Sequence, residues 1–190
     1  MKPPNELKTL DDLIAQAEHY AEFCMKNSGH MAATLFLIGE KGPVMFCPQS
    51  LRDEGEKDEF ANLARLLCIA HAASAVVIAM ESWMKMARPD EILDLTEPPS
   101  QAIDRQEVIT LMGESRGGQK QKILSIVRSG NHKFFNLVDV TPQCDSFGGR
   151  FAQILPSQET TSEHRLLAEA MLRIKGVGIG NPGRTIRLKS

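Results

Sequence analysis

The residues from Glu107 to Arg128 decide the fold. They read EVITLMGE (107–114), SRGGQ (115–119) and KQKILSIVR (120–128). Two apolar runs flank a short turn with two glycines, which is typical of a β-hairpin. A further run, Lys133 to Val140, follows the turn Ser129-Gly130-Asn131. Strands joined by such short turns pair antiparallel, because a parallel pair needs a long crossover connection. The stretch therefore predicts an antiparallel meander.

Upstream of this meander, three more apolar runs are typical of strands. The β-branched run Val76 to Met80 predicts a buried strand, which we expect to continue toward Trp83. Residues 33–38 and 44–47 flank the glycine-containing loop 39–43, a pattern that predicts a second hairpin. Downstream of the meander, Phe151 to Leu155 is a candidate edge strand.

Helical spacing of apolar residues appears in three other places. The first predicted helix spans about 10–26, with Thr9 and Asp12 as a variant capping box. The second spans about 56–73. The third spans 163–175, with Thr161 or Ser162 as its cap. We expect its inward face to comprise Leu166, Leu167, Ala170, Met171 and Ile174.

These elements predict an α/β protein of the α+β type. A central, mostly antiparallel five-stranded sheet would be flanked by about three helices, in the order α-β-β-α-β-β-β-α. Residues 1–175 would form a single domain, and residues 176–190 a basic, glycine-rich, flexible tail. The element order is similar to that of roadblock and profilin-like domains, a likeness that implies a fold and no activity.

Composition places the chain among ordinary globular proteins. Its 190 residues are 42% hydrophobic and 24% charged, with a net charge of -2, which excludes wholesale disorder. The longest apolar runs fall short of the roughly 18 residues of a membrane span, and Met1 to Glu6 begin no secretory signal. We therefore expect a cytoplasmic protein without a membrane partner. The four cysteines have no metal-ligand spacing, so we expect neither a metal site nor a cofactor.

A short pattern lies at the end of the predicted buried strand and at the start of the next strand. Glu81-Ser82-Trp83-Met84, followed by Asp104-Arg105-Gln106-Glu107, resembles small uncharacterised bacterial and mobile-element proteins. The resemblance covers about 30 residues and implies a bacterial origin. It implies no activity.

The same segment holds a candidate pocket made of Glu81, Trp83, Arg105 and Glu107. Strand alternation puts Glu81 and Trp83 on one face, and pairing of the two strands would bring Arg105 and Glu107 near them. A carboxylate beside an indole has a raised pKa, which an arginine lowers again. The group could serve a small-molecule-binding protein or a hydrolase. It could equally be a structural Arg–Glu pair that pins two strands.

Charge divides the chain into two halves of opposite sign. Residues 1–114 carry 10 basic and 19 acidic side chains, whereas residues 115–190 carry 12 and 5. The second half could bind nucleic acid or another anion, dock on an acidic surface, or neutralise the first half within the fold. Its candidate anion-binding residues are Arg116, Lys120, Arg173, Lys175, Arg184, Arg187 and Lys189.

The function favoured by these patterns is a non-enzymatic interaction module. We expect it to self-associate, most simply as a dimer, and to hold a protein partner through its polarised charge. Nucleic-acid binding by the basic C-terminal part and a Glu/Trp/Arg pocket are the alternatives. The sequence leaves open whether the protein is an enzyme.

Overall fold

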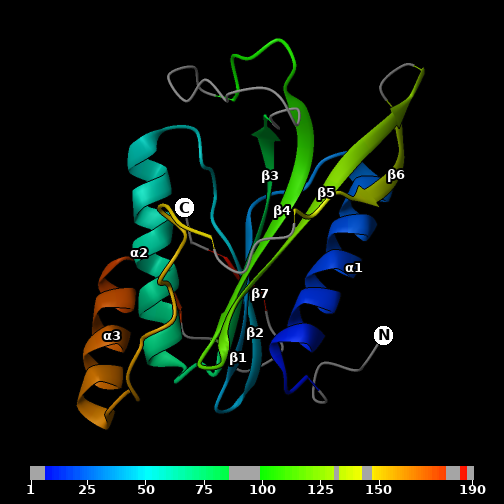
Figure 1. The fold of residues 1–190 in the computed structure, drawn as a ribbon. Helices are drawn as coiled ribbons and strands as arrows, with labels where there is room; N and C mark the ends of the chain where they lie inside the picture. The colour runs from blue at the N-terminus through cyan, green and yellow to red at the C-terminus, as the bar shows by residue number, and fades with distance from the viewer. Residues whose placement is uncertain (1–6, 86–98, 131–132, 143–146, 179–184, 188–190) are drawn as a thin grey trace.

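A computed structural model of the chain describes residues 7–85, 99–130, 133–142 and 147–178, and the backbone of residues 185–187. These residues form three helices and seven strands (Figure 1). The helices are α1 (Leu10–Ser28), α2 (Glu54–Ala70) and α3 (Ser162–Ile174). The strands are β1 (Thr34–Gly39), β2 (Gly42–Cys47), β3 (Ala75–Met84), β4 (Gln106–Ser115), β5 (Gly118–Ser129), β6 (Lys133–Asp139) and β7 (Thr185–Arg187).

All seven strands belong to one sheet with the order β6-β5-β4-β3-β1-β2-β7. Strands β1 to β6 pair antiparallel with their neighbours, and β7 alone pairs parallel, alongside β2. The register pairs Ala75 with Ser115 and Met84 with Gln106, so β3 and β4 run together over their whole length. The predicted α+β class and the mostly antiparallel sheet are confirmed.

The sheet differs from the prediction in the number of its strands. Four strands follow α2 where the predicted order has three, and β7 lies within the segment 176–190, for which a tail is predicted, so the sheet has seven strands instead of five. Residues 151–155 form no strand, so the expected edge strand there is wrong. That segment is instead held by side chains of α2 and β4. The three-residue β7 is too short to show strand periodicity.

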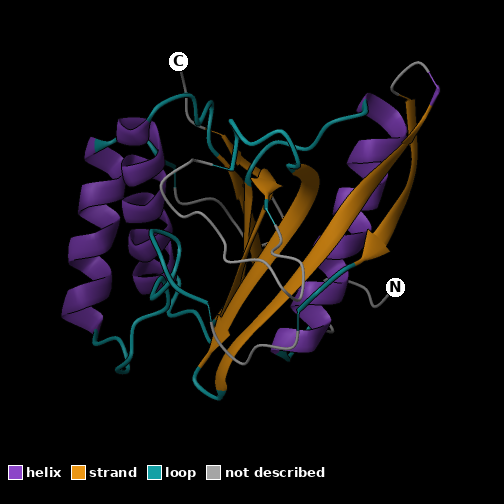
Figure 2. Ribbon diagram, turned by 45° about the horizontal axis from the view of Figure 1, so that its top comes forward, coloured by secondary structure: helices purple, strands orange, loops and turns teal. Residues whose placement is uncertain are grey.

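Helices cover both faces of the sheet in separate layers (Figure 2). One core lies between α1 and the sheet and includes Leu13, Ala17, Val77, Ile109 and Leu124. The other lies between α2 and the opposite face and includes Phe46, Phe60, Leu67, Val76 and Ile78. Strand β3 contributes to both cores with alternate side chains, as a strand covered on both faces must.

The start of α1 is fixed by the predicted capping box. The Thr9 hydroxyl accepts from the Asp12 N–H at 3.1 Å, and the Asp12 carboxylate accepts from the Thr9 N–H at 3.2 Å. Gly113 of β4 then lets the helix approach the sheet closely. A Cβ at Gly113 would lie 2.9 Å from Cδ1 of Leu10, well inside van der Waals contact.

Helix α3 lies against α2 (Figure 1), and its buried residues belong to the core on that side of the sheet. Its inward side chains are Ala168 and Leu172, which are 2% and 0% exposed. The predicted inward face is therefore wrong: Leu166, Leu167, Met171 and Ile174 are 67%, 62%, 40% and 85% exposed. The helix is apolar on more than one side, and the side that carries the small Ala168 faces α2, where two helices must approach closely.

A buried carboxylate on β4 holds the loop before α3 against the sheet. Glu114 is 5% exposed and faces α2. Its Oε1 accepts from the Gln153 N–H at 2.5 Å, and its Oε2 accepts from the Leu155 N–H at 2.9 Å. A buried charge is tolerated where such bonds satisfy it. Ile154, between the two donors, is buried in the core on the α2 side.

We predict that Glu114→Gln lowers the free energy of unfolding by about 1–3 kcal/mol, because one oxygen acceptor becomes an NH₂ group facing a backbone donor. The measurement is urea denaturation at neutral pH. Glu159→Gln is the matched control, since Glu159 is 84% exposed and pairs only at the surface with Arg116. Equal stability of the two variants would show that the buried carboxylate does not hold this loop.

Candidate functional site

Three of the four residues of the candidate pocket lie together at one end of the sheet. Glu81 and Trp83 continue the face of β3 that carries Val77 and Ala79 toward α1. Trp83 is the cross-strand partner of Glu107 on β4. The strand pairing thus places the indole and two carboxylates on one face, near the C-terminal end of α1.

Glu107 is held by an arginine that the sequence analysis did not single out. Nε and Nη2 of Arg128, on β5, donate to its two carboxylate oxygens at 2.8 and 2.6 Å. The Arg128 Nη1 donates to the Gly29 carbonyl at 3.2 Å. This bidentate pair ties β4 to β5 and to the end of α1. The signal that could have found it is the hairpin register, which pairs Val108 with Ser125 and so brings Arg128 close to Glu107.

Glu81 lies in a different electrostatic environment from Glu107. Its Oε1 accepts a hydrogen bond from the backbone N–H of Met31. Half-burial raises the pKa of the Glu81 carboxyl above its usual range, and the nearby Glu107 carboxylate adds to the increase.

Arg105 contacts the indole of Trp83 and not the carboxylates. Its guanidinium carbon lies 4.6 Å from the ring centroid, and its Nη1 donates to the Ser100 carbonyl at 2.6 Å. Trp83 is 44% exposed. The contact is a cation–π pair at the surface, which holds residues 100–105 near the end of β3. The four candidate residues thus divide into two neighbouring groups, both bonded within the fold.

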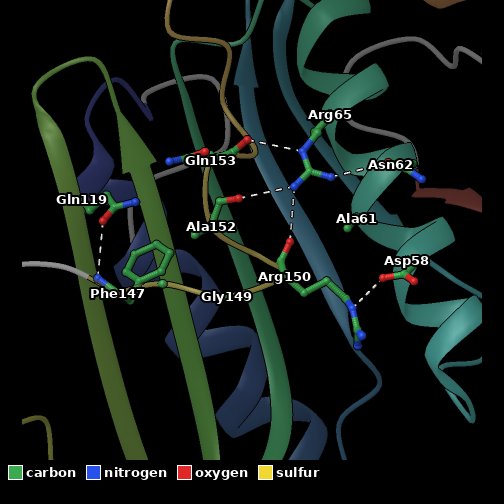
Figure 3. A pocket seen from close by; sticks show the side chains of 11 residues that line it. Asp58, Ala61, Asn62, Arg65, Gln119, Phe147, Gly149, Arg150, Ala152 and Gln153 are labelled. Atoms are coloured by element: carbon green, nitrogen blue, oxygen red, sulfur yellow. Dashed lines mark hydrogen bonds and ion pairs between the residues drawn. The ribbon is translucent and has the colours of Figure 1, made fainter.

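A cavity of about 760 Å³ lies on the other side of the sheet, between α2 and the loop 147–153 (Figure 3). Arg65, one of two arginines that line it, donates to the carbonyls of Arg150, Ala152 and Gln153 at 3.3–3.4 Å. Arg150 pairs with Asp58 at 2.7 Å and also with Glu54. The charged groups around this cavity therefore serve to fasten the loop to α2.

Four of the candidate anion-binding residues have described side chains, and each forms an ion pair. Arg116 pairs with Glu159 at 2.6 Å, Lys120 with Asp11 at 2.6 Å, Lys175 with Glu59 at 2.7 Å, and Arg173 with Glu169 at 3.6 Å. The side chains of the other three candidate residues lie outside the described part of the structure. Arg184 and Lys189 lie outside the described residues, and Arg187 is described by its backbone in β7.

Most of these ion pairs join the basic half of the chain to the acidic half. Besides Lys120 and Lys175, four other residues of the second half bind carboxylates of the first half: Lys122 binds Glu18, Arg128 binds Glu107, Arg150 binds Glu54, and Arg165 binds Glu40. This pattern supports the alternative in which the two halves neutralise each other within the fold.

One helix carries several large apolar side chains that are exposed in the described part of the structure, and we call this surface the outward face of α3. We define it as Leu166, Leu167, Ala170, Met171 and Ile174, all of which are exposed. At 100° per residue, Leu166, Leu167, Ala170 and Ile174 lie about 120–180° from the middle of the side formed by Ala168 and Leu172, which are buried in the core with α2, and Met171 lies nearer to that side. Single exposed apolar residues are common, but a continuous apolar face on one helix is typical of a binding surface.

Among the described residues, no group of three or more His, Cys, Asp or Glu side chains is arranged to hold a metal ion. No described helix is both long enough and apolar enough to cross a membrane. Comparisons with protein-family models, curated proteins and solved structures found no match to this chain.

We predict that the variant Glu81→Gln gains stability relative to the natural protein as the pH rises from about 4 to about 7. The raised pKa of Glu81 means that the folded state binds this proton more tightly than the unfolded chain does. The resulting stability is present below the unfolded pKa and is lost as the pH rises through the folded one. A glutamine oxygen still accepts from Met31 and carries no charge.

The measurement is the free energy of unfolding of both proteins at the two pH values. Glu22→Gln is the control, because Lys26 lowers the pKa of the Glu22 carboxyl and its removal gives no such gain. A stability difference between Glu81→Gln and the natural protein that does not change with pH would contradict the prediction.

Proposed function

We propose that this protein is a non-enzymatic interaction module that self-associates through the outward face of α3. The observation that carries the proposal is the exposure of Leu166, Leu167 and Ile174, at 67%, 62% and 85%, on one side of a helix whose other side is buried. Full burial of such a side chain contributes about 1.5–3 kcal/mol. Binding of a partner to this face therefore adds a favourable free energy of apolar burial, which the folded monomer lacks.

The contacts at the other candidate sites favour this proposal over a pocket-based activity. Glu107 is bonded to Arg128, Glu81 to the Met31 N–H, and Arg105 to Ser100 and Trp83. These bonds connect the strands and the end of α1, as expected of a structural Arg–Glu pair. Among the described residues, no such bond involves the outward face of α3, where Leu166, Leu167 and Ile174 are exposed.

Charge has a secondary role in the proposed module. The ion pairs between the two halves leave little excess charge on the described basic residues of the second half. Nucleic-acid binding through Lys120 or Lys175 would require separation from Asp11 or Glu59. Cys24, Cys47 and Cys68 are free thiols, which supports the cytoplasmic location that we propose with this function.

The first test is the mass of the protein in solution, measured by sedimentation equilibrium over a range of concentrations. We expect reversible self-association of the natural protein. Leu167→Glu should weaken it at least tenfold, since a charge on a buried apolar contact costs more than about 1.4 kcal/mol. The control is Ile103→Glu, because Ile103 is fully exposed and lies outside α3. A natural protein that stays monomeric at millimolar concentration would overturn the proposal.

The salt dependence of the association separates apolar from electrostatic attraction. We expect the dimer to persist at about 1 M NaCl, where the Debye length is about 3 Å and surface ion pairs are screened. A complex held by the polarised charge of the chain would dissociate under these conditions. Sedimentation at low and high salt is the measurement, with thermal unfolding at each salt concentration as the control for folding.

A further inference from the structure

The charges at the two ends of the outward face of α3 define what can cover it. Glu163 lies in the first turn of the helix and Arg173 in the last. Both are exposed; at 100° per residue Glu163 lies within about 20° of Ile174, at the middle of the face, and Arg173 lies beside Leu166, at one edge. Leu166, Leu167, Ala170 and Met171 thus lie along the helix between an acidic and a basic residue, and Ile174 follows Arg173 directly.

From this arrangement we infer that the occupant is α3 of a second copy of the chain, running antiparallel. The inference rests on the proposed function and specifies its geometry. In an antiparallel pair related by a two-fold axis, Glu163 of each copy lies beside Arg173 of the other. In a parallel pair, Glu163 would face Glu163 and Arg173 would face Arg173. Unlike charges attract and like charges repel across an interface, so the antiparallel direction is favoured.

The sizes of the apolar side chains agree with the same direction. When Glu163 is level with Arg173 of the partner, Leu166 is level with Ala170 of the partner. A large side chain then meets a small one twice across the axis, which is how two helices interdigitate. The opposed helix macrodipoles add a further small attraction.

Arg173 is available for this contact. Its side chain is 72% exposed, and within its own helix it lies 3.6 Å from Glu169. An exposed pair at this i,i+4 spacing contributes only about 0.3–0.5 kcal/mol. The guanidinium can therefore turn to Glu163 of the second copy at little cost.

The expected complex is small and reversible. A helix of 13 residues is about 20 Å long. Two such helices bury less than the roughly 1,600 Å² of a standard protein–protein interface. We therefore expect a dissociation constant in the micromolar range or weaker, which sedimentation can follow directly.

The experiment reverses the two charges singly and together. Glu163→Lys and Arg173→Glu each place like charges together twice in the antiparallel dimer. Each should raise its dissociation constant about fivefold to tenfold. The double variant Glu163→Lys/Arg173→Glu restores both attractions and should return the constant to within about twofold of the natural one.

The parallel arrangement gives a different pattern. In a parallel dimer, positions 163 and 173 of one copy face the same positions of the other copy. Like charges therefore still meet in the double variant, and it shows no rescue relative to the single variants. Glu22→Lys and Lys26→Glu are the matched controls, because Glu22 and Lys26 form an exposed i,i+4 pair on α1. They change the net charge equally and should leave the constant unchanged. Thermal unfolding of every variant separates loss of the helix from loss of the contact.

The outcomes distinguish failure of this inference from failure of the proposed function. Rescue by the double variant supports the antiparallel pair. A natural protein that self-associates and is disrupted by Leu167→Glu, without rescue by the double variant, overturns the antiparallel geometry and leaves the proposed function standing. A natural protein that is monomeric at millimolar concentration overturns both.

Discussion

The constraint on which the structure depends is that β3 is apolar on both faces. Val76 and Ile78 face α2, whereas Val77 and Ala79 face α1, and all four are buried. A strand of this kind needs cover on both sides of the sheet. The sequence before and after β1–β2 supplies one helix for each face. Helix α3 packs beside α2 and adds Ala168 and Leu172 to the core on that face.

The acidic and basic halves of the chain assist this arrangement more than they attract a partner. Lys120 binds Asp11 and Lys122 binds Glu18, so two lysines of β5 hold α1 over the sheet. Arg150 binds carboxylates of α2 on the other face. Each exposed pair contributes little by itself, yet together they match each helix to its own part of the sheet.

Local signals allowed most of the fold to be predicted, and long-range contacts explain what was missed. The Thr9–Asp12 cap and the glycine-containing hairpin turns are properties of neighbouring residues, which the sequence displays directly. The orientation of α3 depends on which side meets α2, a matter of close packing at Ala168 that periodicity does not encode. Arg128 escaped notice because its partner, Glu107, lies 21 residues away and meets it only through the register of β4 and β5.

The outward face of α3 is presented in a fixed orientation, and this favours its use as a contact surface. Arg165 binds Glu40 near the start of the helix, and Lys175 binds Glu59 just beyond its end. Between them, Leu172 is fully buried against α2. A surface held at both ends loses little conformational freedom when a partner covers it, so more of the apolar free energy remains as affinity. The ion pairs that neutralise the chain thus also orient the outward face of α3.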